Sequence, residues 1–74
     1  MALREEIREV LDEHLDAVPQ SDAAPLHVPS LALVLILEAL EVKYDLRFSA
    51  KDLAGAKLDT VERLVAFVQA RLQR

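Results

Sequence analysis

A single serine, Ser30, lies between a proline and a long apolar run in the stretch HVPSLALVLILEAL, residues 27–40. A serine hydroxyl acts as a nucleophile when a base lies within hydrogen-bond reach and backbone N–H groups stabilise the oxyanion. His14 and His27 are the only imidazole bases in the chain, and no glycine-rich turn is present to direct such N–H groups. We therefore expect no catalytic residue and no enzymatic activity, and we expect Ser30 to be acted on by another protein.

The sequence lacks the residues that thiol chemistry or a metal site of cysteines and histidines would require. The chain has no cysteine, which excludes a disulfide, a thiol nucleophile and a thiolate metal site, and two isolated histidines do not form a metal site. We interpret His14 and His27 as surface or partly buried side chains without a function. Tyr44, Phe48 and Phe67 are assigned to core packing rather than to a ligand pocket.

The element that carries Ser30 is expected to be a helix over residues 30–44. Pro29 fixes φ just before the first turn, and Ser30 suits an N-cap or first-turn position. A strand is the competing interpretation of the run LALVLIL, but its leucines and alanines and the glutamates that follow favour a helix. The face expected to enter the core consists of Leu33, Ile36, Leu37, Leu40 and Tyr44.

Apolar residues at helical spacing predict a first helix over residues 3–17, which Pro19 stops. Its outer faces carry a run of carboxylates between residues 4 and 16, which we interpret as a solvated surface. Residues 19–29 hold three prolines and no periodicity, and we interpret them as a connecting loop.

Two further helices are predicted from their caps. Ser49 and Asp52 form a capping pattern for a short helix over residues 50–54, and Gly55, the only glycine, ends it. Asp59 and Glu62 form a capping-box pattern that opens the last helix. The apolar stripe of that helix is Val61, Leu64, Val65, Val68 and Leu72.

The predicted fold class is all-α, a small bundle of three main helices and one short helix in a single domain over residues 1–74. The composition, 53% apolar and 30% charged, suits such a domain. The net charge of −4 argues against nucleic acid, including recognition by a helix-turn-helix, and against anionic membrane surfaces as partners. No segment has the pattern of a secretory signal or a membrane span, so we expect a cytoplasmic protein.

The order of these parts resembles the acyl carrier protein family and the related peptidyl carriers of modular synthases. That family has a first helix, a long loop, a serine in an Asp-Ser-Leu motif at the start of helix two, a short third helix and a final helix. Here Pro29, Ser30 and Leu31 stand at the motif. The stretch LEALEVKYDLRFS at residues 37–49 is similar to the end of the family's second helix and its turn, and LDTVERLVAFVQARL at residues 58–72 is similar to its last helix.

The resemblance implies that Ser30 carries 4′-phosphopantetheine, attached by a separate phosphopantetheinyl transferase that uses coenzyme A and magnesium. It also implies a freestanding acyl or aminoacyl carrier whose arm holds a building block as a thioester, served by loading and processing enzymes. Pro29 replaces the family's aspartate. That replacement favours a dedicated polyketide, peptide or fatty-acid-like pathway over housekeeping fatty acid synthesis.

The helix after Ser30 also differs from the family's acidic second helix, because it keeps only Glu38 and Glu41. Four apolar residues fall outside its core stripe, and a small domain with one core does not easily bury a helix on every side. The alternative is that Val34 and Leu35 lie deeper in the core. We predict a partner-binding surface beside Ser30 made of Leu31, Val34, Leu35, Glu38, Glu41 and Val42.

A second function stays open from the sequence. In it the chain is never modified and serves as a carrier-like helical interaction module through the apolar side of the helix that begins at Ser30. A dimer through Leu31, Leu35 and Val42 belongs to this alternative. The carrier requires the Ser30 hydroxyl, whereas the interaction module does not.

Overall fold

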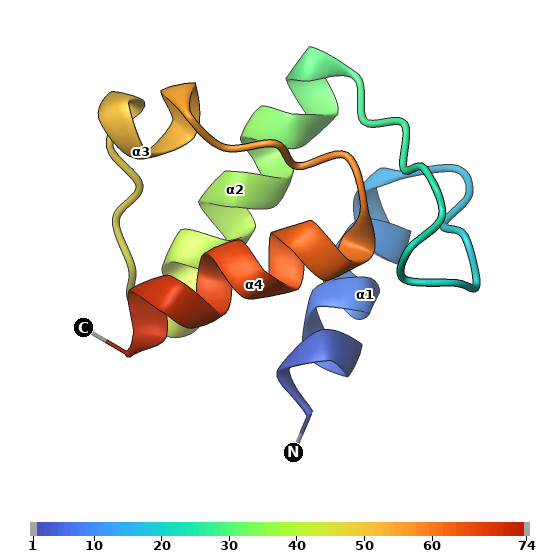
Figure 1. Ribbon diagram of the computed structural model, residues 1–74, viewed down its shortest axis with the longest axis horizontal. Helices are drawn as coiled ribbons and strands as arrows, with labels where there is room; N and C mark the ends of the chain where they lie inside the picture. The colour runs from blue at the N-terminus through green and yellow to red at the C-terminus, as the bar shows by residue number, and fades with distance from the viewer. Residues whose placement is uncertain (1, 74) are drawn as a thin grey trace.

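The computed structural model describes residues 2–73, and this part of the chain folds into four helices (Figure 1). They are α1 (Leu3–His14), α2 (Ser30–Tyr44), α3 (Ala50–Ala54) and α4 (Val61–Leu72). No strand occurs among the described residues, so the all-α prediction is confirmed. The bounds of α2 and α3 are those predicted from the sequence.

The first helix is shorter than predicted, because it ends at His14 and not at residue 17. Leu15 leaves the helix in an extended conformation (φ −123°, ψ 146°), although its N–H still donates to the Leu11 carbonyl oxygen at 2.8 Å. This early exit turns Leu15 and Val18 toward the core, where both pack as partly buried side chains. Tertiary packing therefore ends the helix before Pro19 forces it to end.

The core forms where α1 packs against both α2 and α4. No polar or charged side chain is buried among the described residues, so the core is purely apolar. Each fully buried leucine, isoleucine or valine stabilises the fold by roughly 1.5–3 kcal/mol relative to an exposed one. The buried side chains are Ile7, Val10, Leu11, Leu26, Ile36, Leu37, Leu40, Val61, Leu64 and Val68.

The predicted core stripes are confirmed in their centres and fail at their ends. In α2, Leu33 and Tyr44 are only partly buried, on either side of a buried centre. In α4, Val65 is partly buried and Leu72 is 42% exposed. Leu72 occupies the last position of its helix, where the helix has passed the core, and its predicted place in the core was wrong.

The caps of the last two helices show one success and one error. In α3 the Asp52 N–H donates to the Ser49 Oγ at 3.0 Å and the Ser49 N–H donates to an Asp52 oxygen at 3.1 Å, as the capping pattern predicts. In α4 the N-cap is Thr60, whose Oγ1 accepts from the Arg63 N–H at 3.0 Å. The predicted cap at Asp59 was wrong, because Asp59 instead pairs with the Arg63 guanidinium at 3.2 Å.

The loop between α1 and α2 is fixed to the helices on two sides by Asp22. Its carboxylate pairs with Arg8 at 2.7 Å and also with Arg4. Its carbonyl oxygen accepts from the Glu62 N–H at 3.1 Å, at the start of α4. The buried Leu26 lies on the same loop. The segment predicted as a simple connector therefore ties α1 to α4.

Tyr44 ties the far end of α2 to α1. Its hydroxyl donates a hydrogen bond to the Glu6 Oε1 at 2.6 Å. Burial, followed by this hydrogen bond to the negatively charged Glu6, raises the pKa of Tyr44 above its usual value.

None of the helices in the described part of the chain combines the length and the apolar character that crossing a bilayer requires.

The Asp22 pairs predict how stability changes with pH. Hydrogen bonds from Arg4 and then Arg8 lower the pKa of Asp22 below its usual value. A lowered pKa in the folded state means that the stabilisation is present above the unfolded value of about 3.9 and is lost as the pH falls through the folded value. Asp22→Asn should therefore lower the melting temperature at neutral pH, and the gap from the wild type should close in acid.

The control for this prediction is Asp59→Asn, because Asp59 also pairs with an arginine but is 64% exposed in its side chain. Its melting temperature should differ little from the wild type at either pH. A gap for Asp22→Asn that stays the same size from neutral to acid pH would contradict the assignment.

Candidate functional site

Ser30 is the first residue of α2 and is exposed to solvent. Pro29 precedes it in an extended conformation (φ −59°, ψ 149°), and no side chain caps this end of the helix. Among residues 2–73 the Ser30 side chain makes no hydrogen bond. The sequence therefore placed this hydroxyl correctly in the first turn, where it is accessible to another protein.

The electrostatics around Ser30 favour an anion. The first hydrogen bond of α2 runs from the Leu33 N–H to the Pro29 carbonyl oxygen at 2.9 Å, so the N–H groups before Leu33 are left without helical partners. No acidic residue lies in this first turn. A phosphate on the Ser30 oxygen would thus sit at the positive end of the helix dipole.

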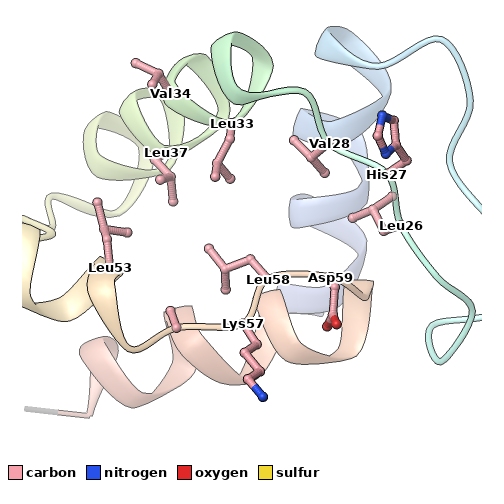
Figure 2. A pocket seen from close by; sticks show the side chains of 11 residues that line it. Leu26, His27, Val28, Leu33, Val34, Leu37, Leu53, Lys57, Leu58 and Asp59 are labelled. Atoms are coloured by element: carbon pink, nitrogen blue, oxygen red, sulfur yellow. The ribbon is translucent and has the colours of Figure 1, made fainter.

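An apolar cavity of about 540 Å3 lies between α2, α3 and the segment before α4. Figure 2 shows the side chains of Leu33, Leu37 and Leu53 directed into this space, with Leu58 facing them from the opposite wall. The residues that line it are Leu26, His27, Val28, Leu33, Val34, Leu37, Leu53, Ala56, Lys57, Leu58 and Asp59. The lining of the cavity is therefore mainly apolar.

The cavity begins about one helical turn, roughly 5.4 Å along the axis, from Ser30. Ser30, Val34, Leu37 and Glu41 follow one another at the spacing that places residues on one side of a helix. A second apolar cavity of about 160 Å3 continues along this row toward Phe48, because it shares Val34 and Leu37 with the larger one. A group attached to Ser30 thus has an apolar path beside it.

The four apolar residues predicted to contact a partner are all exposed. Leu31 is 74% exposed, Val34 52%, Leu35 45% and Val42 84%. The alternative that Val34 and Leu35 lie deep in the core is wrong for this structure. Leu31, Leu35 and Val42 share one side of α2, whereas Val34 borders the cavities. Partner binding by these residues stays a prediction.

The two glutamates of the predicted partner surface have different environments. Glu38 is exposed. Glu41 is half-buried, and its Oε2 accepts a hydrogen bond from the Phe48 N–H at 2.8 Å. Glu41 therefore holds the link between α2 and α3 in place, a structural contact that the sequence analysis missed. The only feature of the sequence that could have indicated this contact is the short spacing between Glu41 and the predicted start of α3.

The histidines lie near Ser30 without forming a cluster. His14 Nδ1 donates to the Val10 carbonyl oxygen at 2.9 Å at the end of α1. His27 is exposed and borders the large cavity as well as a cleft of about 320 Å3 that it shares with His14 and Pro29. Within residues 2–73 no three histidine, cysteine or acidic side chains come together as a metal site would require.

The cavity itself was not foreseen. Leu53 and Leu58 lie in a short helix and in a linker, where too few residues exist to define an apolar face. The sequence indicated their place at the cavity only in that both are large apolar residues outside the predicted core stripes.

Comparisons of the chain with protein-family models, with curated proteins and with solved structures find no match.

The contact between Glu41 and Phe48 predicts unequal effects of the two glutamates on stability. Glu41→Ala leaves the Phe48 N–H without its acceptor, and an unsatisfied, partly buried donor costs roughly 1–3 kcal/mol. Glu38→Ala changes an exposed residue and should alter the free energy of unfolding by less than about 0.5 kcal/mol. Urea denaturation of both variants measures the difference, and equal destabilisation would contradict the assigned contact.

Proposed function

We propose that the protein is a freestanding carrier of the acyl or peptidyl carrier type, and not itself an enzyme. Ser30 holds 4′-phosphopantetheine, and the thiol of that arm carries an acyl or aminoacyl building block as a thioester. The observation that supports this function best is an exposed hydroxyl without a partner at the positive end of α2, one helical turn from an apolar cavity.

The modification requires a phosphopantetheinyl transferase with magnesium. The Ser30 oxygen forms a bond to the phosphorus of coenzyme A that bears the pantetheine. The pyrophosphate bond breaks, adenosine 3′,5′-bisphosphate leaves, and the hydroxyl proton passes to a base on the transferase. What this chain contributes is an accessible hydroxyl and unpaired backbone N–H groups that stabilise the product phosphodiester.

The loading and processing enzymes are proposed to dock on the exposed apolar side of α2. Leu31, Leu35 and Val42 lie on one side of this helix and all are well exposed. Only Glu38 adds negative charge beside them without an assigned structural contact. Hydrophobic packing would thus replace charge steering as the basis of recognition. A partner that recognises such a surface fits a dedicated polyketide, peptide or fatty-acid-like pathway.

A second candidate is an interaction module of the same fold that is never modified. The exposure of Val42 and Leu31, at 84% and 74%, favours it, because a surface of this kind is suited to protein association whatever happens at Ser30. In this case a second copy of the chain or another apolar surface covers the same side of α2.

Intact mass spectrometry tests the carrier function. The protein is incubated with coenzyme A, magnesium and a broad-specificity phosphopantetheinyl transferase, and Ser30→Ala serves as the control. The wild type should gain the mass of one phosphopantetheine group and the control none. Pro29→Asp restores the residue of the carrier motif, so a protein that stays unmodified both as wild type and as Pro29→Asp would rule out the proposed modification.

A second pair of variants separates the two candidates. Leu35→Glu places a charge in the exposed apolar surface, whereas Ser30→Ala removes only a hydroxyl. Pathway activity in a strain that depends on this chain should be lost with Ser30→Ala if the protein is a carrier. Retained activity with Ser30→Ala, together with loss in Leu35→Glu, would instead favour the interaction module. Circular dichroism of both variants checks that the helices are intact.

A further inference from the structure

A further groove, which we call the linker groove, lies between α4 and the linker that follows α3, residues 55–60. Its volume is about 490 Å3, and α4 contributes Arg63, Ala66 and Phe67 to its border. Figure 1 shows the linker running back along α4 to the start of that helix. Residues 56–58 of the linker border both this groove and the large cavity beside α2. No residue of α2 borders the linker groove, so it is separate from the surface around Ser30.

The floor of the linker groove contains an aromatic ring that other contacts hold in place. Phe67 packs against Phe48 with 5.0 Å between ring centroids. The Arg71 guanidinium lies over the Phe67 ring, 4.9 Å from its centroid, and pairs with the Asp52 carboxylate at 2.8 Å. Phe67 is partly buried against the core, as the sequence analysis predicted, and it also borders the groove. An apolar molecule that enters the groove therefore meets a ring already in position, which lowers the ordering cost of binding.

Gly55 leaves one end of the linker groove open. Its backbone lies in the right-handed helical region (φ −97°, ψ 0°), so its conformation does not require glycine. A Cβ at this position would meet no atom within 4 Å outside its two chain neighbours, so no close contact requires glycine either. The only glycine of the chain thus stands where its effect is the absence of a side chain at the border of the groove.

Two cationic side chains and no acidic one border the linker groove. Lys57 is exposed and forms no ion pair among residues 2–73. Figure 2 shows its nitrogen directed away from the large cavity. Arg63 pairs with Asp59 at 3.2 Å, and their side chains are 53% and 64% exposed. An exposed pair of this kind contributes roughly 0–1 kcal/mol, so the carboxylate of a ligand can compete with it.

We propose that the linker groove binds a small aromatic monocarboxylate. The aromatic body packs on Phe67, and the carboxylate accepts hydrogen bonds from Lys57 and Arg63. The volume of the groove lies within the range of small-molecule sites. An inorganic anion would leave the apolar floor unused, and an uncharged molecule would leave both cations unused. The net charge of −4 disfavours a polyanion.

This site involves neither Ser30 nor α2, so it does not depend on whether the protein is a carrier. Nuclear magnetic resonance titration of the 15N-labelled protein with 4-phenylbutyrate tests it. The backbone N–H signals of Gly55 and Ala66 should shift and saturate. The signals of Val34 and Leu37, which border the large cavity and not the groove, should stay near their free positions.

Charge is tested on both the ligand and the protein. The uncharged 4-phenylbutanamide has the same body and should bind about tenfold more weakly, because it loses two exposed charge contacts. Lys57→Gln should raise the Kd of 4-phenylbutyrate about threefold, as expected for one such contact. Lys51→Gln is the matched control, since Lys51 is an exposed lysine of α3 that does not border the groove, and its Kd should equal that of the wild type.

The apolar part of the site is tested by Gly55→Leu, which fills the open end of the groove. This variant should weaken the binding of 4-phenylbutyrate and of the amide alike, and circular dichroism checks that its helices are intact. If it folds poorly, the comparison of Lys57→Gln with Lys51→Gln still decides the matter. The proposal would be overturned by equal affinity for acid and amide, by equal Kd values in the two lysine variants, or by shifts centred on Val34 and Leu37. Absence of a saturable shift at Gly55 and Ala66 would overturn it as well.

Discussion

The packing of α1 between α2 and α4 is the contact on which the remaining structure depends. Its buried face, Ile7, Val10 and Leu11, supplies the centre of an entirely apolar core. Because α1 lies against both of the other long helices, α2 and α4 meet each other less closely than each meets α1. The space that remains between α2 and the segments around α3 is the leucine-lined cavity. A chain this short thus builds one tight core and one loosely covered apolar space.

Outside that core, carboxylates hold the irregular segments in place. The Asp22 carboxylate ties the long loop to α1, the Glu41 carboxylate ties the end of the next loop to α2, and the Asp52 carboxylate ties α3 to α4. Each tie lies at the edge of the core, where water does not fully screen it and where hydrogen bonds satisfy the charge. The same residues would count as ordinary surface charge in the sequence. Their contacts therefore position the segments that surround the core.

Local signals made α2, α3 and the position of Ser30 predictable from the sequence. Proline fixes the start of α2, and the cap of α3 is formed by residues three apart, so both depend on neighbours in the chain. The predicted end of α1 and the predicted cap of α4 were wrong. Packing decides where Leu15 leaves the first helix, and Thr60 competes with its neighbour Asp59 for the cap position, and the sequence pattern encodes neither effect. The cavity and the carboxylate ties were missed for a related reason. Periodicity identifies which face of a helix is apolar, but it does not give the separation between helices or the partner of a distant charge.

The hydrogen bond between Tyr44 and Glu6 gives the molecule an intrinsic optical reporter. Tyr44 is the only tyrosine of a chain that contains no tryptophan, so the near-ultraviolet absorption of the protein comes mainly from one phenol ring. That ring lies at the junction between α1 and α2, and its absorption and emission respond to the carboxylate beside it. Spectroscopy of the unlabelled protein therefore reports directly on the contact between α1 and α2, without a dye or a substitution.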